Sequence, residues 1–190
     1  MVAEANDAVL VERAQAGDRD AFAQLATRHS DRLTRFLITM AGDESIADDV
    51  RQESLQRAFT HLDQLLDPTR FASWLLSIAC NQCRKRLRAD VQRAHAGDEA
   101  LATVSDGRRS ALSSLVRRED ALQLALAIER LPILLREAFV LFAVEGLPYS
   151  EIAAITGATE GTLQVRAHRA KALLRQQLGA GSDTWWQRPQ

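Results

Sequence analysis

The chain has 190 residues and a formal net charge of -1, so its overall charge gives no argument for binding to nucleic acid. Charged residues make up 26% of it, and no uncharged apolar run approaches the ~20 residues of a spanning helix, which predicts no insertion in a membrane. The hydrophobic content of 46% is enough for one ordinary core or two small ones. The first eight residues lack the basic start and apolar stretch of a secretory signal, so we expect a cytoplasmic protein.

Four amphipathic helices are expected in the first half, because apolar residues recur there at spacings of three and four. The first covers residues 7–16. The second begins at Asp18, whose side chain can cap a helix, and ends at Gly42, since glycine commonly terminates helices. The third begins near Ser45, and the fourth covers residues 70–88.

Two interruptions divide this pattern. The segment from Asp63 to Arg70 is expected to be a loop, because Pro68 cannot continue a helix. From Ala89 to about Leu115 the periodicity fades and small polar residues dominate, which predicts a flexible linker. We therefore expect an all-α fold of two small helical domains, divided into residues 1–92, a linker of 93–116, a second domain of 117–178 and a tail of 179–190.

The second domain is expected to contain a helix-turn-helix. A short helix over residues 150–156 is followed by Gly157, which supplies a left-handed turn, and Thr159 can cap a longer helix that ends near Leu178. One side of that helix is an apolar stripe, formed by Leu163, Ala167, Ala170 and Leu174. The opposite side is polar and cationic, which suits the major groove, although a solvated pair of helices gives the same pattern.

Cys80 and Cys83 are the only cysteines, and they lie three apart within a helical pattern. A lone C-x-x-C has no second half for a zinc site, so we interpret both as structural thiols in or near a core. The chain also lacks a glycine-rich phosphate loop, a metal-ligand spacing and a nucleophile motif. We therefore expect no enzyme activity, no cofactor and no bound metal.

Positive charge is concentrated in two short segments. Four cations occur within five residues of the fourth helix, and the last helix carries five potential cations and no acid between Arg166 and Arg175. The third helix has a polar side instead, whose members lie three and four apart. Taken alone, that polar side is best interpreted as a solvated, salt-bridged surface.

Several segments in both halves follow the pattern of one known family. In the first half they are 18–22, 47–53, 57–59 and 71–81, and in the second half Arg136-Glu137-Ala138-Phe139, Glu145 to Ala153 and Glu160-Gly161-Thr162-Leu163. They resemble the extracytoplasmic-function sigma factors of the sigma-70 family, which give bacterial RNA polymerase its promoter specificity. The resemblance implies a transcription initiation factor.

By position, the resemblance implies a role for each polar surface. The third-helix side would dock on the clamp helices of the polymerase and comprises Asp48, Asp49, Gln52, Glu53 and Arg57. The fourth helix and the loop before it would bind minus-ten DNA, where Leu65 or Leu66 replaces the usual aromatic that receives a flipped base. The remaining minus-ten residues are Asn81, Arg84, Lys85, Arg86 and Arg88, the cations reaching phosphate.

The last helix would read the minus-thirty-five element with Thr162, Gln164, Val165, Arg166, His168, Arg169 and Lys171. Gln164 and Val165 depart from the family pattern, in which a basic residue and then serine are usual. The resemblance thus implies three partners: core RNA polymerase, promoter DNA and an anti-sigma factor that we expect to be anchored in the membrane. The alternative is a sigma-like decoy that binds an anti-sigma factor without DNA; it would lack the basic face and carry a receiver domain.

Overall fold

The computed structural model describes residues 6–95 and 115–179, and within them every regular element is helical, as predicted. None of the described helices is both long and apolar enough to cross a membrane. The elements are α1 (Asp7–Gln15), α2 (Arg19–Ala41), α3 (Glu44–Thr60), the 3-10 turns η1 (Leu62–Gln64) and η2 (Pro68–Arg70), α4 (Phe71–His95), α5 (Leu115–Glu129), α6 (Ile133–Phe139), the π-helical turn η3 (Val140–Val144), α7 (Tyr149–Thr156) and α8 (Glu160–Leu178).

The ends of α2 follow from its flanking residues. The Asp18 carboxylate accepts a hydrogen bond from the Ala21 amide at 3.1 Å, and Gly42 ends the helix in the left-handed conformation, with φ of 77°. The start of α3 differs slightly from the prediction. Its capping side chain is that of Asp43, which accepts from the Ile46 amide at 2.8 Å, so the helix begins before Ser45.

The helix α4 is longer than the pattern of apolar residues predicts, because it continues past Arg88 to His95. Its last turns are stabilised by charge: Asp90 lies 3.3 Å from Arg86 and 3.0 Å from Arg93, at spacings of four and three. A periodicity that weakens therefore does not end this helix. The expected linker otherwise lies outside the described residues, since α5 already begins at Leu115.

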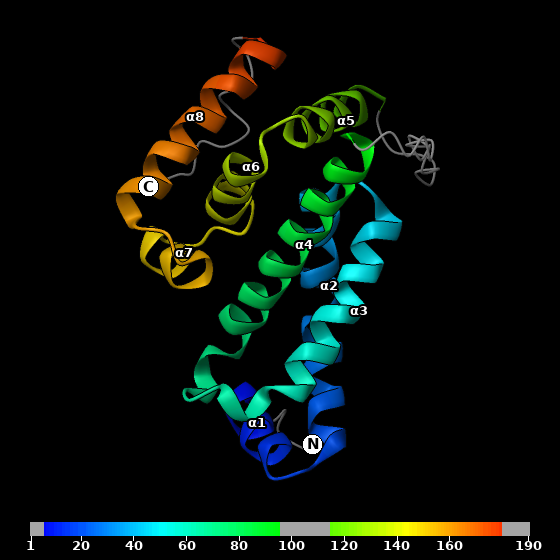
Figure 1. Ribbon diagram of the computed structural model, residues 1–190, viewed down its shortest axis with the longest axis vertical. Helices are drawn as coiled ribbons and strands as arrows, with labels where there is room; N and C mark the ends of the chain where they lie inside the picture. Colours follow the sequence, from blue (N-terminus) through cyan, green and yellow to red (C-terminus); the bar gives the residue numbers. More distant parts are fainter. Residues whose placement is uncertain (1–5, 96–114, 180–190) are drawn as a thin grey trace.

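The two halves of the chain are packed against one another (Figure 1). In the first half, α2, α3 and α4 surround a core that contains Phe36, Leu37 and Phe71, and α1 packs across one end of α2. In the second half, α8 packs on α5, α6 and α7. The halves meet where α4 contacts α7 and where α2 contacts α5 and η3. The long helix α4 thus belongs to the first core and also to the junction.

The helix α1 is fixed to α2 by a polar cluster. The Asp7 carboxylate lies 2.5 Å from Arg28 Nη1 and 2.7 Å from His29 Nε2. Burial alone would raise the pKa of Asp7, but the hydrogen bonds and charges of Arg28 and His29 outweigh this effect and hold the pKa below its ordinary value. The cluster therefore stabilises the fold when Asp7 is ionised.

We predict that Asp7→Asn lowers the free energy of unfolding near neutral pH by up to about 1 kcal/mol, as for other partly exposed ion pairs. The carboxylate stabilises the fold above its unfolded-state pKa of about 4, and this contribution is lost as the pH falls through the lower folded-state value. Urea unfolding at about pH 6 and about pH 3 measures the difference. Asp31→Asn, at an exposed site on α2, the helix that Asp7 binds, is the control. An Asp7→Asn penalty of equal size at both pH values would contradict the assignment.

Candidate nucleic-acid and polymerase interfaces

The pair α7 and α8 forms the predicted helix-turn-helix. The helix α7 ends at Gly157, which is left-handed with φ of 72°, and the Thr159 hydroxyl accepts from the Thr162 amide at 3.3 Å at the start of α8. The predicted apolar stripe of Leu163, Ala167, Ala170 and Leu174 is buried. The amino-terminal turns of α8 consequently present their opposite side to solvent, in a form that a major groove accepts.

The side chains of the predicted DNA face of α8 differ in how accessible they are. Thr162, Gln164, Val165, His168 and Arg169 are exposed. Arg166 is half-buried and acts on the buried carboxylate of Glu137, and the Lys171 ammonium lies 4.9 Å above the Phe142 ring, which itself stacks on Tyr149. Two of the cations therefore interact within the protein, whereas His168 and Arg169 extend from it.

The polar side of α3 is exposed as a continuous surface. All five predicted polymerase-binding side chains, Asp48, Asp49, Gln52, Glu53 and Arg57, lie on it. Arg57 Nε lies 3.4 Å from Glu53 Oε1, an oxygen that also accepts from Gln82 Nε2 at 2.9 Å. This hydrogen bond from α4 orients Glu53, so part of the surface is held in place by the neighbouring helix.

The predicted minus-ten residues of α4 are close together but not equally free. Asn81, Arg84, Lys85 and Arg88 line a hollow of about 590 Å³ together with Ala89 and Gln92. Arg84 donates one hydrogen bond to the Asn81 side chain, and another of its nitrogens lies 3.4 Å from Glu137 of α6. Lys85 and Arg88 remain exposed. The hollow is cationic, and one of its cations already binds the second half of the chain.

The two leucines considered for base capture differ in their exposure to solvent. Leu65 is buried, with 6% of its surface exposed, and so belongs to the core rather than to a DNA surface. Leu66 is 94% exposed. In this loop the accessible apolar side chain is therefore that of Leu66.

A buried acid lies where α4 meets α6. Glu137 is fully buried, and its Oε1 has no hydrogen-bond partner while its Oε2 faces Arg84. Burial raises the pKa of Glu137, against the opposing charges of Arg84 and Arg166. The sequence does not predict this role, because an arginine-glutamate pair on a helix usually indicates a solvated surface.

The two cysteines lie on the same side of α4 as this acid, and both are fully buried. Burial, together with the charge of Glu137, raises the pKa of Cys80, and burial raises the pKa of Cys83 to about 11. The interpretation as structural thiols agrees with this burial. Within the described part of the chain, no three histidine, cysteine or acidic side chains are grouped as a metal site would require.

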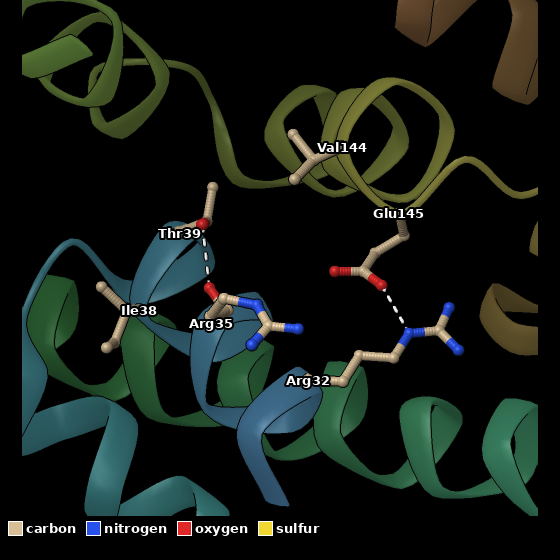
Figure 2. A pocket seen from close by; sticks show the side chains of 6 residues that line it. All are labelled: Arg32, Arg35, Ile38, Thr39, Val144 and Glu145. Carbon is tan, nitrogen blue, oxygen red and sulfur yellow. Dashed lines mark hydrogen bonds and ion pairs between the residues drawn. The ribbon is translucent and has the colours of Figure 1, made fainter. Parts of the chain in front are cut away.

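A second hollow, of about 430 Å³, lies between α2 and η3 (Figure 2). Arg32 Nε donates to Glu145 Oε2 at 2.7 Å across it, and the Arg35 guanidinium points into the same space (Figure 2). A further contact across the junction joins α4 to α7, where the Ser73 hydroxyl donates to the Glu151 carboxylate. Polar contacts besides Arg84–Glu137 thus join the halves.

Two family models match the chain. The model described as Sigma-70 region 2 matches residues 25–93, and that described as Sigma-70, region 4 matches residues 121–174. Among curated relatives, RNA polymerase sigma factor CarQ of Myxococcus xanthus is 35% identical over 172 residues, which cover 89% of this chain and 95% of CarQ. The ECF RNA polymerase sigma-E factor of Salmonella typhimurium is 35% identical over 179 residues, which cover 90% of this chain and 93% of that factor.

Two solved structures have a fold similar to that of this chain. CnrH in complex with the cytosolic domain of CnrY has a TM-score of 0.67 and 29% identity, and the match covers 92% of this chain and 97% of CnrH. The sigma factor RpoE in complex with the anti-sigma factor NepR from Bartonella quintana has a TM-score of 0.71 at 24% identity, and the match covers 84% of this chain and 97% of that chain. The second likeness concerns the fold alone.

We predict that Arg84→Ala makes Cys80 and Cys83 react faster with a thiol reagent. Glu137 would lose the charge of Arg84 while still buried, and only the smaller effects of Cys80 and Arg88 would remain on α4. This loss favours separation of the halves by about 1–3 kcal/mol, or a roughly 5- to 150-fold faster reaction. Lys85→Ala removes an adjacent exposed cation, and it should leave the rate unchanged. Equal rates for wild type and Arg84→Ala would show that Arg84 does not hold the junction.

Proposed function

The chain belongs to the sigma-70 family and is of the extracytoplasmic-function type, and we propose that it binds core RNA polymerase and directs it to specific promoters in the cytoplasm. The observation that carries this proposal is the exposed face of α8, where His168 and Arg169 project beside Gln164 and Val165 from a helix with a capped amino-terminal end. The function is that of a transcription initiation factor, and no catalytic residue is assigned to it.

Reading of the minus-thirty-five element is assigned to α8. Arg169 and Gln164 can donate to base edges, and Val165, which is 51% exposed, offers an apolar contact to a thymine methyl group. Arg166 and Lys171 contribute less to base reading in this proposal, because their charges act on Glu137 and on the Phe142 ring. Specificity then depends on a small number of exposed side chains.

Binding of the minus-ten element is assigned to α4 and the loop before it. Asn81 and Leu66 would contact the non-template strand, while Arg84, Lys85, Arg86 and Arg88 would bind phosphates. Lys85 and Arg88 are exposed, which supports this role directly. Arg84 must first leave Glu137, so use of the whole surface requires the two halves to separate.

Polymerase binding is assigned to the exposed side of α3. Its acids and Gln52 form a polar surface that belongs to a different helix from the basic residues of α8. The hydrogen bond from Gln82 fixes the Glu53 side chain in position before a partner binds. This division gives the chain one surface for protein and two for DNA, as a factor that brings polymerase to a promoter requires.

We further propose an anti-sigma partner, anchored in the membrane, that keeps the chain inactive. The family resemblance and the similarity to CnrH, solved with the cytosolic domain of CnrY, support a protein partner. The contact between Arg84 and Glu137 adds support from this chain itself, because a partner that stabilises the packed halves would also cover minus-ten residues. The decoy alternative is less favoured, since the cationic face of α8 is exposed.

We predict that Arg169→Ala weakens binding to the cognate promoter by about 1–3 kcal/mol if Arg169 makes a bidentate base contact. The loss should be smaller on unrelated DNA, because a phosphate contact carries no sequence information. Run-off transcription with purified core polymerase on genomic fragments first identifies the promoter, and filter binding then measures affinity. Arg175→Ala, in the last turn of the same helix, is the control. An unchanged affinity for Arg169→Ala would refute its role, and a wild-type chain that binds core but never initiates would favour the decoy.

A second prediction concerns polymerase binding. Asp49→Arg reverses the charge of an exposed side chain on α3 and should weaken core binding about tenfold or more, which corresponds to 1.4 kcal/mol. Arg169→Ala should leave core affinity unchanged in the same titration. Asp31→Arg, an equivalent reversal on the exposed side of α2, tests whether charge alone is responsible. Equal core affinities of Asp49→Arg and wild type would exclude Asp49 from the interface.

A further inference from the structure

The loop between α3 and α4 presents Leu66 in a defined direction. Its neighbour Leu65 is anchored in the core at 6% exposure, while Leu66 is 94% exposed. After it, the Asp67 carboxylate accepts from the Thr69 amide at 3.0 Å and from the Thr69 hydroxyl at 2.6 Å, which fixes the turn η2 through local contacts. The residues that follow Leu66 therefore need no distant partner to keep their shape.

The residues that precede Leu66 are held from a distance. Gln15 ends α1, and its Nε2 donates at 2.9 Å to the Leu62 carbonyl and at 2.9 Å to the Leu65 carbonyl. Both hydrogens of the side-chain amide are thereby used on the two ends of one short turn. The Leu65 carbonyl belongs to the peptide that leads directly into Leu66. Its orientation consequently sets the direction in which the Leu66 side chain leaves the backbone.

We propose that Gln15 is a positioning residue for promoter opening, which acts through Leu66 by fixing the peptide before it. The inference rests on the proposed function, in which Leu66 meets a base of the separated non-template strand. Loss of the two hydrogen bonds allows the Leu65–Leu66 peptide to rotate, so that only a fraction of molecules present Leu66 correctly and the apparent affinity for the opened strand falls by that fraction. α1 is suited to this task because Leu10 and Val11 are fully buried and Asp7 binds α2.

Three substitutions separate the donor function of Gln15 from its bulk. Gln15→Glu keeps the size and the polarity but can only accept hydrogen bonds when ionised, whereas Gln15→Leu removes donor and acceptor together. Gln15→Lys restores donors that can reach the two carbonyls. Promoter opening is measured as the permanganate reactivity of unpaired thymines in complexes of core polymerase, the full-length chain and a duplex promoter.

We expect Gln15→Glu and Gln15→Leu each to reduce the opened fraction by about fivefold to tenfold, and Gln15→Lys to recover most of it. Core affinity should not change. The decisive measurement is a double-mutant cycle with Leu66→Ala. If Gln15 acts through Leu66, Gln15→Glu has no further effect in the Leu66→Ala chain.

The outcomes distinguish this inference from the function on which it rests. If the wild-type chain opens the promoter and the Gln15 and Leu66 effects multiply independently, or if Gln15→Glu opens as well as wild type, the positioning role is overturned and the proposed function remains. If wild type binds core polymerase and never opens a promoter, the proposed function fails first. If the circular dichroism of Gln15→Glu shows a loss of helix, Gln15→Leu replaces it in the double-mutant cycle. A folding defect in one variant therefore does not decide the result.

Discussion

The junction of the two halves depends on one buried guanidinium. Arg136 Nη1 donates to the Met40 carbonyl at 2.6 Å, and Nη2 donates to the carbonyls of Glu129 and Leu131. These carbonyls lie at the carboxyl ends of α2 and α5, where helices leave acceptors without partners and favour a positive charge. Burial lowers the pKa of Arg136, but an arginine remains protonated in proteins. Removal of this side chain would leave the ends of two helices unsatisfied together.

The position of Arg136 next to Glu137 explains why the junction reaches the candidate DNA surface. The same turn of α6 that binds the end of α2 directs a carboxylate at Arg84 of α4. One oxygen of that carboxylate has no partner, and Arg136 Nε has none either. A buried ionic contact with unsatisfied atoms costs free energy that hydrophobic packing does not. One of the contacts that hold the packed arrangement, Arg84–Glu137, is therefore one in which a phosphate group can replace the carboxylate on Arg84.

Prediction from sequence was reliable where the cause is local. Asp18, Gly42, Gly157 and Thr159 end or cap helices as expected, since a cap depends on residues three or four positions away. It was incomplete where the cause is distant or lacks a period. The burial of Glu137 depends on packing of α4, and the Leu65 carbonyl is bound by Gln15, 50 residues earlier. Neither contact leaves a periodic pattern in the sequence.

The cationic side chains of the two basic segments differ in whether they make contacts within the protein, and this difference does not follow from the sequence. Arg84 binds Glu137, Arg86 lies 3.3 Å from Asp90, and Lys171 covers the Phe142 ring, so these charges partly stabilise the protein. Lys85, Arg88, His168 and Arg169 are exposed. An exposed lysine or arginine can bind a phosphate more readily than one that is already paired with an acid. Arg88 is intermediate, because it is exposed and its charge also acts on Glu137. Because the net charge is only -1, attraction to DNA in the proposed function would depend on these few exposed side chains.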